Sequence, residues 1–303
     1  MFFFNDCKNI ALHGIHGCNS PSWSVHPFFC ENLGFYNIKI TAPADSHNTD
    51  GIDPECCKNI EIIGCEISTG DDCIALKAGK MHVGMYYQTP TENTVIRNCL
   101  MRDGHGAIVL GSEMSGGIRD LTVSQCLFQG TDRGLRIKTR RGRGKYAVID
   151  GVEFDNIRME NVKAPLVINM YYNCDPDGNT EYVWSREKWP VDDGTPYFGA
   201  FTFKNMVCVD AEYAAGYFDG LVEMPIESVT IENVSVSFKE EAQEGRPAMQ
   251  TVWKTYCKAG WYFDNVKNVN LHNARLQGVV GEEIIQNHCQ NVTVTDDETK
   301  EGA

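Results

Sequence analysis

The chain has 303 residues, of which 42% are hydrophobic and 22% are charged, so it is long enough to bury one large core or two ordinary ones. Its 41 acidic and 27 basic residues give a net charge of −14, which argues against a general affinity for nucleic acid or for an anionic membrane surface. An anionic substrate would therefore require a local cluster of basic residues.

The first residues, MFFFNDCKNI, have neither the basic start nor the apolar stretch of a signal peptide. No later run approaches the about 20 apolar residues that cross a membrane. The sequence thus predicts no membrane association, and it gives no cellular address.

One short sequence phrase recurs along the chain. Its copies include CKNIALHGI from Cys7, CENLGFYNIKI from Cys30, CKNIEIIGCEI from Cys57, IRDLTVSQCLF from Ile118, IESVTIENVSV from Ile226 and CQNVTV from Cys289. Each copy joins a polar pair to alternating apolar residues, which is the period-2 pattern of a short strand with one buried face. The closest starts lie 23 residues apart, from position 7 to position 30, a spacing typical of one coil of a solenoid.

The repeat predicts an all-β fold, a right-handed parallel β-helix, with residues 1–303 in a single domain. A leucine-rich array is disfavoured because leucine is sparse at fixed offsets, and a propeller because no WD-like signature occurs. Residues 173–199 form the longest break in the repeat and are rich in turn formers, which indicates a surface loop. The charged tail, residues 296–303, is expected to fray.

The 13 cysteines could form disulfides or remain as free thiols. Their number is odd and no CxxC pair occurs, so neither a disulfide framework nor a zinc site is favoured. Cys7, Cys30, Cys57 and Cys289 occupy the same place in their phrases. This regularity favours a row of buried thiols inside the solenoid, since free cysteine is among the most buried residue types.

Four polar phrases lie where strands begin or end: HNTDG at 47–51, GDD at 70–72, GHG at 104–106 and RGLRIKT at 133–139. In a parallel solenoid the equivalent ends of successive strands line up, so these phrases are expected to meet in one groove. Each phrase alone has a simpler interpretation. HNTDG is ordinary turn chemistry, GDD could be a solvated corner or part of a calcium site, and RIKT could be an exposed strand edge.

Taken together, in this order, the four phrases resemble the signature segments of the polygalacturonases, family 28 of the glycoside hydrolases, which cleave the galacturonan backbone of pectin. The resemblance extends through SPSWSVHP at 20–27 and GSEMSGGIRD at 111–120 to NMYYN at 169–173. It implies hydrolysis of α-1,4-galacturonosyl linkages by a monomer that needs no cofactor and no metal. Full-length relatives of this kind are expected to be secreted or periplasmic.

Hydrolysis of a glycosidic bond requires one carboxyl group to protonate the leaving oxygen and another to deprotonate the attacking water. Asp50 and the pair Asp71 and Asp72 lie about one coil apart, and coils are spaced by about 4.8 Å. We therefore expect carboxyl groups roughly 6.5 to 9.5 Å apart, the separation of an inverting enzyme. Crowding three carboxylates should raise the proton affinity of at least one of them. Both members of the pair can face one cleft only if the strand bends or ends at Gly70.

The resemblance assigns roles to these residues. Asp71 looks like the general acid, Asp50 and Asp72 like the pair that holds the nucleophilic water, and His105 like a group that tunes the protonation of the acid. The glycines on either side of His105 would let the backbone approach the sugar.

The substrate-binding residues implied by the resemblance are Asn48, Arg136, Lys138 and Tyr171. The two basic residues lie two apart on one strand, so they point the same way and can bind a uronate carboxylate. Tyr171 would pack on the sugar, or else be a core aromatic. The run Arg140, Arg141, Arg143 and Lys145 is expected to add uronate contacts, and a nucleic-acid patch is disfavoured by the net charge.

Two features modify the resemblance. The insertion KMHVGMYYQTPTEN between GDD and GHG is similar to the loops of exo-acting bacterial and plant members, which close one end of the cleft. The HNTDG segment begins unusually early, so N-terminal coils are expected to be missing. Three alternatives stay open: a calcium-dependent β-helical pectate lyase, a rhamnogalacturonan-acting relative, and a noncatalytic carbohydrate-binding protein.

Overall fold

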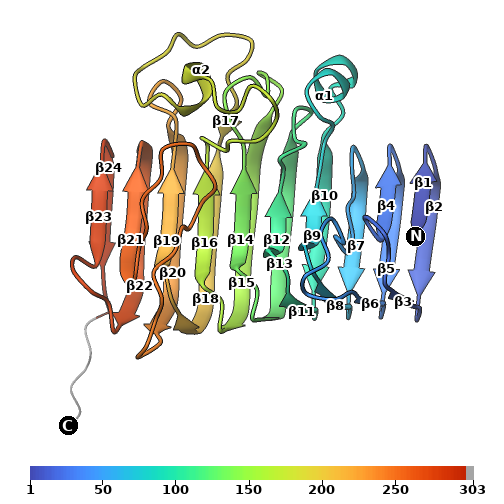
Figure 1. The fold of residues 1–303 in the computed structure, drawn as a ribbon, viewed down its shortest axis with the longest axis horizontal. Coiled ribbons are helices and arrows are strands. Elements are labelled where there is room, and N and C mark those ends of the chain that lie inside the picture. Colours follow the sequence, from blue (N-terminus) through green and yellow to red (C-terminus); the bar gives the residue numbers. More distant parts are fainter. Residues whose placement is uncertain (298–303) are drawn as a thin grey trace.

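The computed structural model describes residues 1–297, which form a right-handed parallel β-helix (Figure 1). Successive coils stack along the long axis, and the predicted all-β class and solenoid are both confirmed. The expected frayed tail, residues 296–303, lies outside the described residues from position 298 onward. Within residues 1–297, no helix has the length and apolar character needed to span a membrane.

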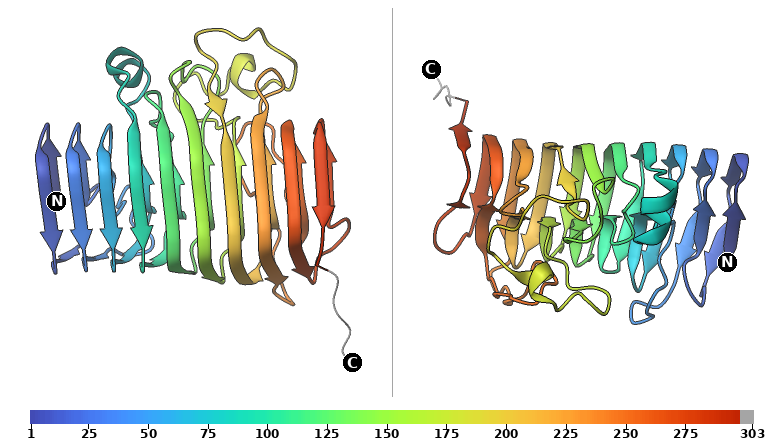
Figure 2. Two further views of the ribbon diagram at one scale, coloured as in Figure 1. Left: turned by 180° about the vertical axis from the view of Figure 1, so that it is seen from behind. Right: turned by 90° about the horizontal axis from the view of Figure 1, so that it is seen from above.

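Most strands belong to two large parallel sheets (Figure 2). The backbone path of the fifteen-stranded sheet comprises β2 (Lys8–His13), β5 (Glu31–Tyr36), β7 (Lys58–Ile63), β10 (Thr91–Arg97), β13 (Ile118–Gln129), β15 (Val148–Glu160), β18 (Ala200–Ala211), β20 (Ile226–Phe238), β22 (Val266–Gln277) and β24 (Asn291–Thr295). The shorter strands β3 (His16–Cys18), β6 (Lys39–Thr41), β8 (Glu66–Thr69), β11 (Leu100–Asp103) and β17 (Tyr197–Phe198) branch from it.

The seven-stranded sheet carries the polar phrases. It contains β9 (Asp72–Leu76), β12 (Gly106–Leu110), β14 (Arg133–Lys138), β16 (Ala164–Asn169), β19 (Ala214–Asp219), β21 (Ala259–Asp264) and β23 (Ile284–Asn287). A two-stranded sheet of β1 (Phe2–Asn5) and β4 (Val25–Phe28) continues it, because residues 52–55 bridge β4 to β9. Two helices, α1 (His82–Tyr87) and α2 (Glu181–Trp184), interrupt the repeat.

The interior consists of rows of apolar side chains from successive coils. In the seven-stranded sheet, Ile74 pairs with Ile108, Ile108 with Leu135, and Leu135 with Leu166, and all four residues are fully buried. Each such side chain contributes about 1.5 to 3 kcal/mol by leaving water. The alternate residues of these strands, Arg136 and Lys138 among them, point outward and build the cleft.

The polar pair at the start of each repeat has a structural reason. Its asparagine adopts a left-handed backbone conformation, with φ of 58° at Asn9, 60° at Asn32 and 57° at Asn59. Asparagine tolerates this region better than most residues. The side chains also form a ladder, in which Asn32 donates to Asn9 over 3.0 Å and Asn59 donates to Asn32 over 2.9 Å.

The predicted row of thiols is confirmed at the N-terminal end of the solenoid. The backbone N–H of Cys7 points to the sulfur of Cys30 at 3.4 Å, and that of Cys30 to the sulfur of Cys57 at 3.3 Å. Cys289 is partly buried against the same core at the other end. All 13 cysteines lie among the described residues and all are free thiols.

Three buried arginines hold the loop at residues 173–199, which contains α2. Arg140 pairs with Asp177 at 2.6 Å and Arg143 with Asp175 at 3.0 Å, and both aspartates belong to the loop. Arg141 donates to the loop carbonyls of Tyr182 and Ser185 at 3.1 and 2.8 Å. It also pairs with Glu223, outside the loop, at 2.5 Å. None of the three guanidinium groups is more than 1% exposed. The expectation that they bind uronate is therefore wrong, because their charges are satisfied inside the protein.

A second long loop, residues 239–258, crosses the outer face of the seven-stranded sheet, and we call it the strap. The guanidinium of Arg133 on β14 donates to the carbonyls of Arg246 and Pro247 at 2.5 and 2.9 Å. Asn169 on β16 donates to the carbonyl of Met249 at 3.0 Å. Beside these bonds, Ala248 packs against outward-facing residues of β16 and β19.

Candidate active site

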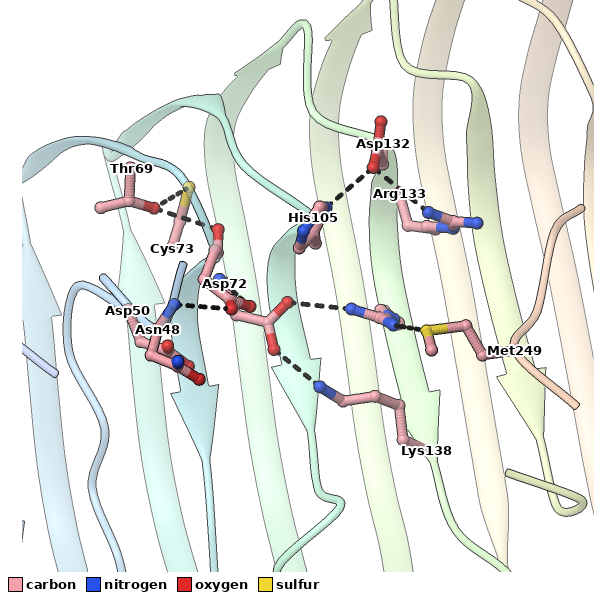
Figure 3. A network of polar contacts seen from close by, with 12 residues as sticks. Asn48, Asp50, Thr69, Asp72, Cys73, His105, Asp132, Arg133, Lys138 and Met249 are labelled. Carbon is pink, nitrogen blue, oxygen red and sulfur yellow. Dashed lines mark hydrogen bonds and ion pairs between the residues drawn. The ribbon is translucent and has the colours of Figure 1, made fainter. Parts of the chain in front are cut away.

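A cleft of about 310 Å³ lies on the outer face of the seven-stranded sheet and gathers all four polar phrases (Figure 3). The residues that line it are Trp23, Asn48, Asp50, Asp71, Asp72, Lys77, His105, Ser112, Glu113, Arg136, Lys138, Tyr172 and Met249. Seven of the eight predicted site residues are in this set. The prediction that distant phrases meet in one groove is therefore confirmed.

The three aspartates form one cluster. One carboxylate oxygen from each of Asp50, Asp71 and Asp72 lies within 4.8 Å of the other two. This is the spacing of the nearest oxygens, which is shorter than the separation of the carboxyl groups, for which roughly 6.5 to 9.5 Å is expected. Asp50 and Asp72 are 4% and 1% exposed, whereas Asp71 is partly exposed. Asp71 is thus the most accessible carboxyl of the cluster.

The strand begins between the paired aspartates, so the alternation of faces does not separate them. Strand β9 starts at Asp72, and Asp71 precedes it in a bend. The carboxylate of Asp71 accepts hydrogen bonds from the backbone N–H groups of Asp72 at 3.0 Å and Asn48 at 3.1 Å. A side chain at Gly70 would lie 2.3 Å from the carbonyl oxygen of Ser46, so only glycine fits this corner.

Gly104 is required at this corner. It has a φ of +73°, and a side chain there would lie 2.2 Å from the carbonyl oxygen of Asp71. Glycine therefore lets the GHG phrase pack against Asp71, and the expected close approach of the sugar stays a prediction. The next residue, His105, donates its backbone N–H to that carbonyl at 3.1 Å.

Two cations hold Asp72 in its ionised form. Lys138 Nζ lies 2.7 Å from Asp72 Oδ2, and Arg136 Nη1 lies 3.3 Å from Oδ1. Burial alone would raise the pKa of this carboxyl, but the charges of Lys138 and Arg136 outweigh it and hold the pKa of Asp72 well below its usual range. The prediction that the two basic side chains point the same way is confirmed.

Asp50 has the opposite electrostatic balance. Burial raises the pKa of Asp50 to about 7, and the negative charges of Asp72 and Asp71 act in the same direction against the positive charge of Lys77. The expectation that crowding raises the proton affinity of one carboxyl thus holds for Asp50. A group with a pKa near neutrality can exchange protons under ordinary conditions.

His105 is paired with a residue that the sequence did not reveal. Its Nδ1 lies 3.0 Å from Asp132 Oδ2, and Lys163 Nζ lies 2.7 Å from the other oxygen of Asp132. The hydrogen bond to Asp132, aided by the negative charge of Asp71, raises the pKa of His105. Burial would raise the pKa of Asp132, but its bonds to His105 and Lys163 hold that pKa below its usual range. His105 therefore favours its positive form.

Tyr171 does not face the cleft, so its expected role against the sugar is wrong. The residue is 1% exposed, and the guanidinium carbon of Arg186 lies 3.7 Å from its ring centre. Its neighbour Tyr172 lines the cleft instead, with Lys138 Nζ 5.8 Å from that ring centre. Both tyrosines follow the end of β16 at Asn169, and the bend at residue 170 precedes them.

Four more residues of the site escaped the sequence analysis: Lys77, Asp53, Glu113 and Trp23. Lys77 Nζ lies 3.8 Å from Asp50, 3.5 Å from Asp53 and 3.5 Å from Glu113. It also lies 4.2 Å from the ring centre of Trp23. The available signals were the lysine that follows the apolar strand DCIAL, and the phrases SPSWSVHP and GSEMSGGIRD, which contain Trp23 and Glu113.

The three clustered oxygens are spaced closely enough to share a cation. Arg136, Lys138 and Lys77 already supply three positive charges to the same cleft. This compensation favours acid/base chemistry as the use of the three carboxylates.

Helix α1, formed by the insertion after β9, lies beside the cleft. In residues 1–297 none of its side chains lines the cleft, and its Tyr87 packs edge-on against Phe29, with ring centres 5.1 Å apart. The insertion therefore does not close the cleft in the way that the sequence suggested.

Comparison with known proteins agrees with the geometry. The sequence profile of the glycosyl hydrolases family 28 matches residues 1–244. A probable polygalacturonase of Vitis vinifera is 34% identical over 237 residues, which cover 78% of this chain and 46% of that protein.

Two solved structures have the same fold. The crystal structure of a hyperthermoactive exopolygalacturonase from Thermotoga maritima superposes with a TM-score of 0.69 at 27% identity, covering 94% of this chain and 54% of that one. A polygalacturonase from Erwinia carotovora ssp. carotovora gives 0.63 at 28% identity, covering 88% and 58%. The chain thus spans about half the length of these relatives, between 46% and 58%. On the extent of the profile match and the shared fold, the chain belongs to family 28 of the glycosyl hydrolases.

Proposed function

We propose that this protein hydrolyses α-1,4-galacturonosyl linkages of galacturonan by general acid/base catalysis with inversion. The observation that carries the proposal is the cluster of one accessible and two buried carboxyl groups beside a buried pair of basic side chains. Family membership supports the same chemistry.

The three aspartates take different roles because their surroundings differ. Asp71, the accessible one, protonates the leaving glycosidic oxygen. Asp72, held as a carboxylate by Arg136 and Lys138, orients the attacking water. Asp50, with a pKa of about 7, accepts the proton of that water. His105 stays positive beside Asp132 and biases the protonation of Asp71 through its charge and its backbone bond.

The substrate carboxylate binds at the basic pair. Arg136 and Lys138 are 7% and 9% exposed, so they offer their charge only within the cleft. They supply the local positive charge that an anionic substrate needs in a chain of net charge −14. Asn48, which is exposed at the rim, and the ring of Tyr172 add contacts to the sugar.

The strap favours exo-action. It covers the outer face of the seven-stranded sheet over β16 and β19, and its Met249 lines the cleft. Internal cleavage requires a polymer to run through an open groove, whereas a groove walled on one side accepts a chain end. The enzyme would then release single galacturonate units, acting as a monomer.

The test compares the protein with its Asp71→Asn variant on polygalacturonate and on a rhamnogalacturonan. We expect new reducing ends from polygalacturonate, with galacturonate as the first product, and a loss of at least about 10²-fold in rate in the variant. A variant as active as the parent would refute the assignment of Asp71.

Other outcomes would favour other functions. An unsaturated product that absorbs in the ultraviolet and disappears on chelation of calcium would identify a lyase. Faster release from the rhamnogalacturonan would identify that polymer as the substrate, and binding without new reducing ends would identify a carbohydrate-binding protein.

A further inference from the structure

Asp53 is a fully buried carboxyl that the proposed catalytic steps do not use. It is 0% exposed, and within residues 1–297 neither of its oxygens has a hydrogen-bond partner. It lies three residues after Asp50, in the segment 52–55 that bridges β4 to β9. Burying a carboxyl group without hydrogen bonds is unfavourable, so its presence here requires an explanation.

Lys77 is the cation that faces this carboxyl. Its Nζ lies 3.5 Å from Asp53 Oδ1 and 3.8 Å from Asp50 Oδ2, and the residue is 3% exposed. Burial would lower the pKa of Lys77, but the charges of Asp53, Glu113 and Asp50 outweigh it and raise that pKa. A permanent positive charge therefore lies beneath the cleft, between Asp50 and Asp53.

The backbone fixes this arrangement. Ile74 and Leu76 point into the core of the solenoid, so Lys77 at the end of β9 points outward. Its backbone bridges to Glu55 in the segment that carries Asp53. The ring of Trp23, 4.2 Å from Nζ, covers the ammonium group on the cleft side. Neither Lys77 nor Asp53 needs to touch the sugar in order to act on Asp50.

We propose that Lys77 and Asp53 are a pair of positioning residues that fix the orientation and set the charge of Asp50. The inference rests on the proposed function only in taking Asp50 as the acceptor of the proton of water. Lys77 attracts the carboxylate form of Asp50 to one place, and Asp53 contacts the same ammonium group and holds it there.

Asp53 acts on Asp50 only through Lys77. The charged groups that act on Asp50 are Lys77 and Lys138, which favour its ionised form, and Asp72 and Asp71, which oppose it. Burial and the charge of Asp50 raise the pKa of Asp53 well above its usual range, so Asp53 is not one of the charges that oppose Asp50. Removing the charge of Lys77 should raise the pKa of Asp50. A residue that only supports the fold would not produce this shift.

The first measurement is the dependence of kcat/KM on pH for Lys77→Met and Asp53→Asn. We expect the acidic limb of the profile to move to higher pH by about 1 unit or more in Lys77→Met, and by less than half as far in Asp53→Asn, because Asp53 acts only through Lys77. Below the limb, a shift of 1 unit lowers the rate about tenfold. We expect KM to change by less than about twofold, and Lys77→Arg to restore the limb.

Glu223→Gln is the matched control. This residue is also a buried carboxyl paired with a cation, but it does not line the cleft. We expect it to lower thermal stability and leave the acidic limb in place. Lower kcat without a moved limb in Lys77→Met, or a limb that moves as far in Asp53→Asn as in Lys77→Met, would overturn the proposal.

A second measurement does not depend on activity. The titration of the Asp50 side-chain carboxyl carbon, followed by NMR and assigned with Asp50→Asn, should move upward in Lys77→Met and less far in Asp53→Asn. These shifts would support the role of Lys77 even if the parent protein hydrolysed nothing, and only the proposed function would then fail. If Lys77→Met did not fold, Lys77→Gln would decide: an unmoved Asp50 titration would refute the proposal.

Discussion

Lys138 Nζ lies 2.7 Å from Asp72 Oδ2, so the cation proposed to bind the substrate already pairs with the carboxylate proposed to orient the water. The two residues are 66 positions apart in sequence and lie on β14 and β9, which flank β12, so their contact spans one intervening coil. In the proposed function, this contact would couple substrate binding to the charge state of Asp72. A uronate carboxylate that approaches Lys138 must share the ammonium group with Asp72.

Lys138→Met should therefore impair both binding and chemistry. Removing one partner of a buried, hydrogen-bonded charge pair leaves the other without compensation, so the pKa of Asp72 rises. We expect kcat/KM on polygalacturonate to fall by at least about 30-fold, with a higher KM. Lys145→Met is the control, because Lys145 bonds Asp193 at the surface. An unchanged KM in Lys138→Met would contradict the proposed uronate site.

Asp132→Asn should change the titration of His105. The hydrogen bond that His105 donates to Asp132 raises the pKa of His105, so its loss should lower that pKa. NMR titration of the imidazole measures the shift directly, with the other histidines as internal references. The basic limb of the kcat/KM profile should move to lower pH, because the positive form of His105 is then lost earlier. An unmoved imidazole titration would show that the observed pair is not maintained in solution.

Asp50→Asn should stabilise the protein in alkali while it abolishes activity. The pKa of Asp50 is raised from 3.8 to about 7 by folding, so the folded state binds more protons than the unfolded state between these values. Stability therefore falls as pH rises through this window. At pH 8 the variant should gain at least about 1 kcal/mol of unfolding free energy, and at pH 3 almost nothing. Thermal unfolding at the two pH values measures this, and an equal gain at both would contradict the assigned cause.

Much of the fold was predictable because it depends on local patterns. The polar pair with its left-handed asparagine and the alternating apolar residues recur in nearly every coil, and each copy specifies the same strand. The four phrases also predicted the cleft, since parallel strands bring their equivalent ends together. These features follow from a few neighbouring residues at a time.

The errors concern positions where the partner lies far away in sequence. Whether Arg141 faces solvent or the core depends on Glu223, which lies 82 positions later. The choice between Tyr171 and Tyr172 depends on a bend after β16 and on Arg186. The link between Lys77 and Asp53 depends on how segment 52–55 joins the sheet. No short-range pattern carries that information.

Arg141→Met should destabilise the protein severely. This variant tests the buried part of the basic run. It leaves Glu223 buried with its charge uncompensated, which costs about 3 to 5 kcal/mol. Lys145→Met in the same run removes an exposed pair and should cost no more than about 1 kcal/mol. Denaturant unfolding of both variants measures the difference. Equal small losses would mean that the loop at 173–199 is not anchored by Arg141.

Arg133→Met should change the products rather than the chemistry, because Arg133 bonds the strap and contacts none of the three clustered carboxylates. Its guanidinium donates to the carbonyls of Arg246 and Pro247, and the methionine side chain cannot replace these two bonds. Its Nη1 also lies 3.4 Å from Asp132 Oδ2. Without Arg133 the strap would keep its bonds to Asn169 and Tyr217 and the packing of Ala248 against β16 and β19. If the strap walls one side of the cleft, loosening it should let a polymer lie across the sheet. We expect a larger share of oligogalacturonides among early products and a faster fall in viscosity per reducing end released, with the acidic limb of the pH profile unmoved.

Lys163→Met is the matched control, since it removes a neighbouring cation from Asp132 without touching the strap. A product pattern identical to that of the parent would assign exo-action to some other part of the molecule.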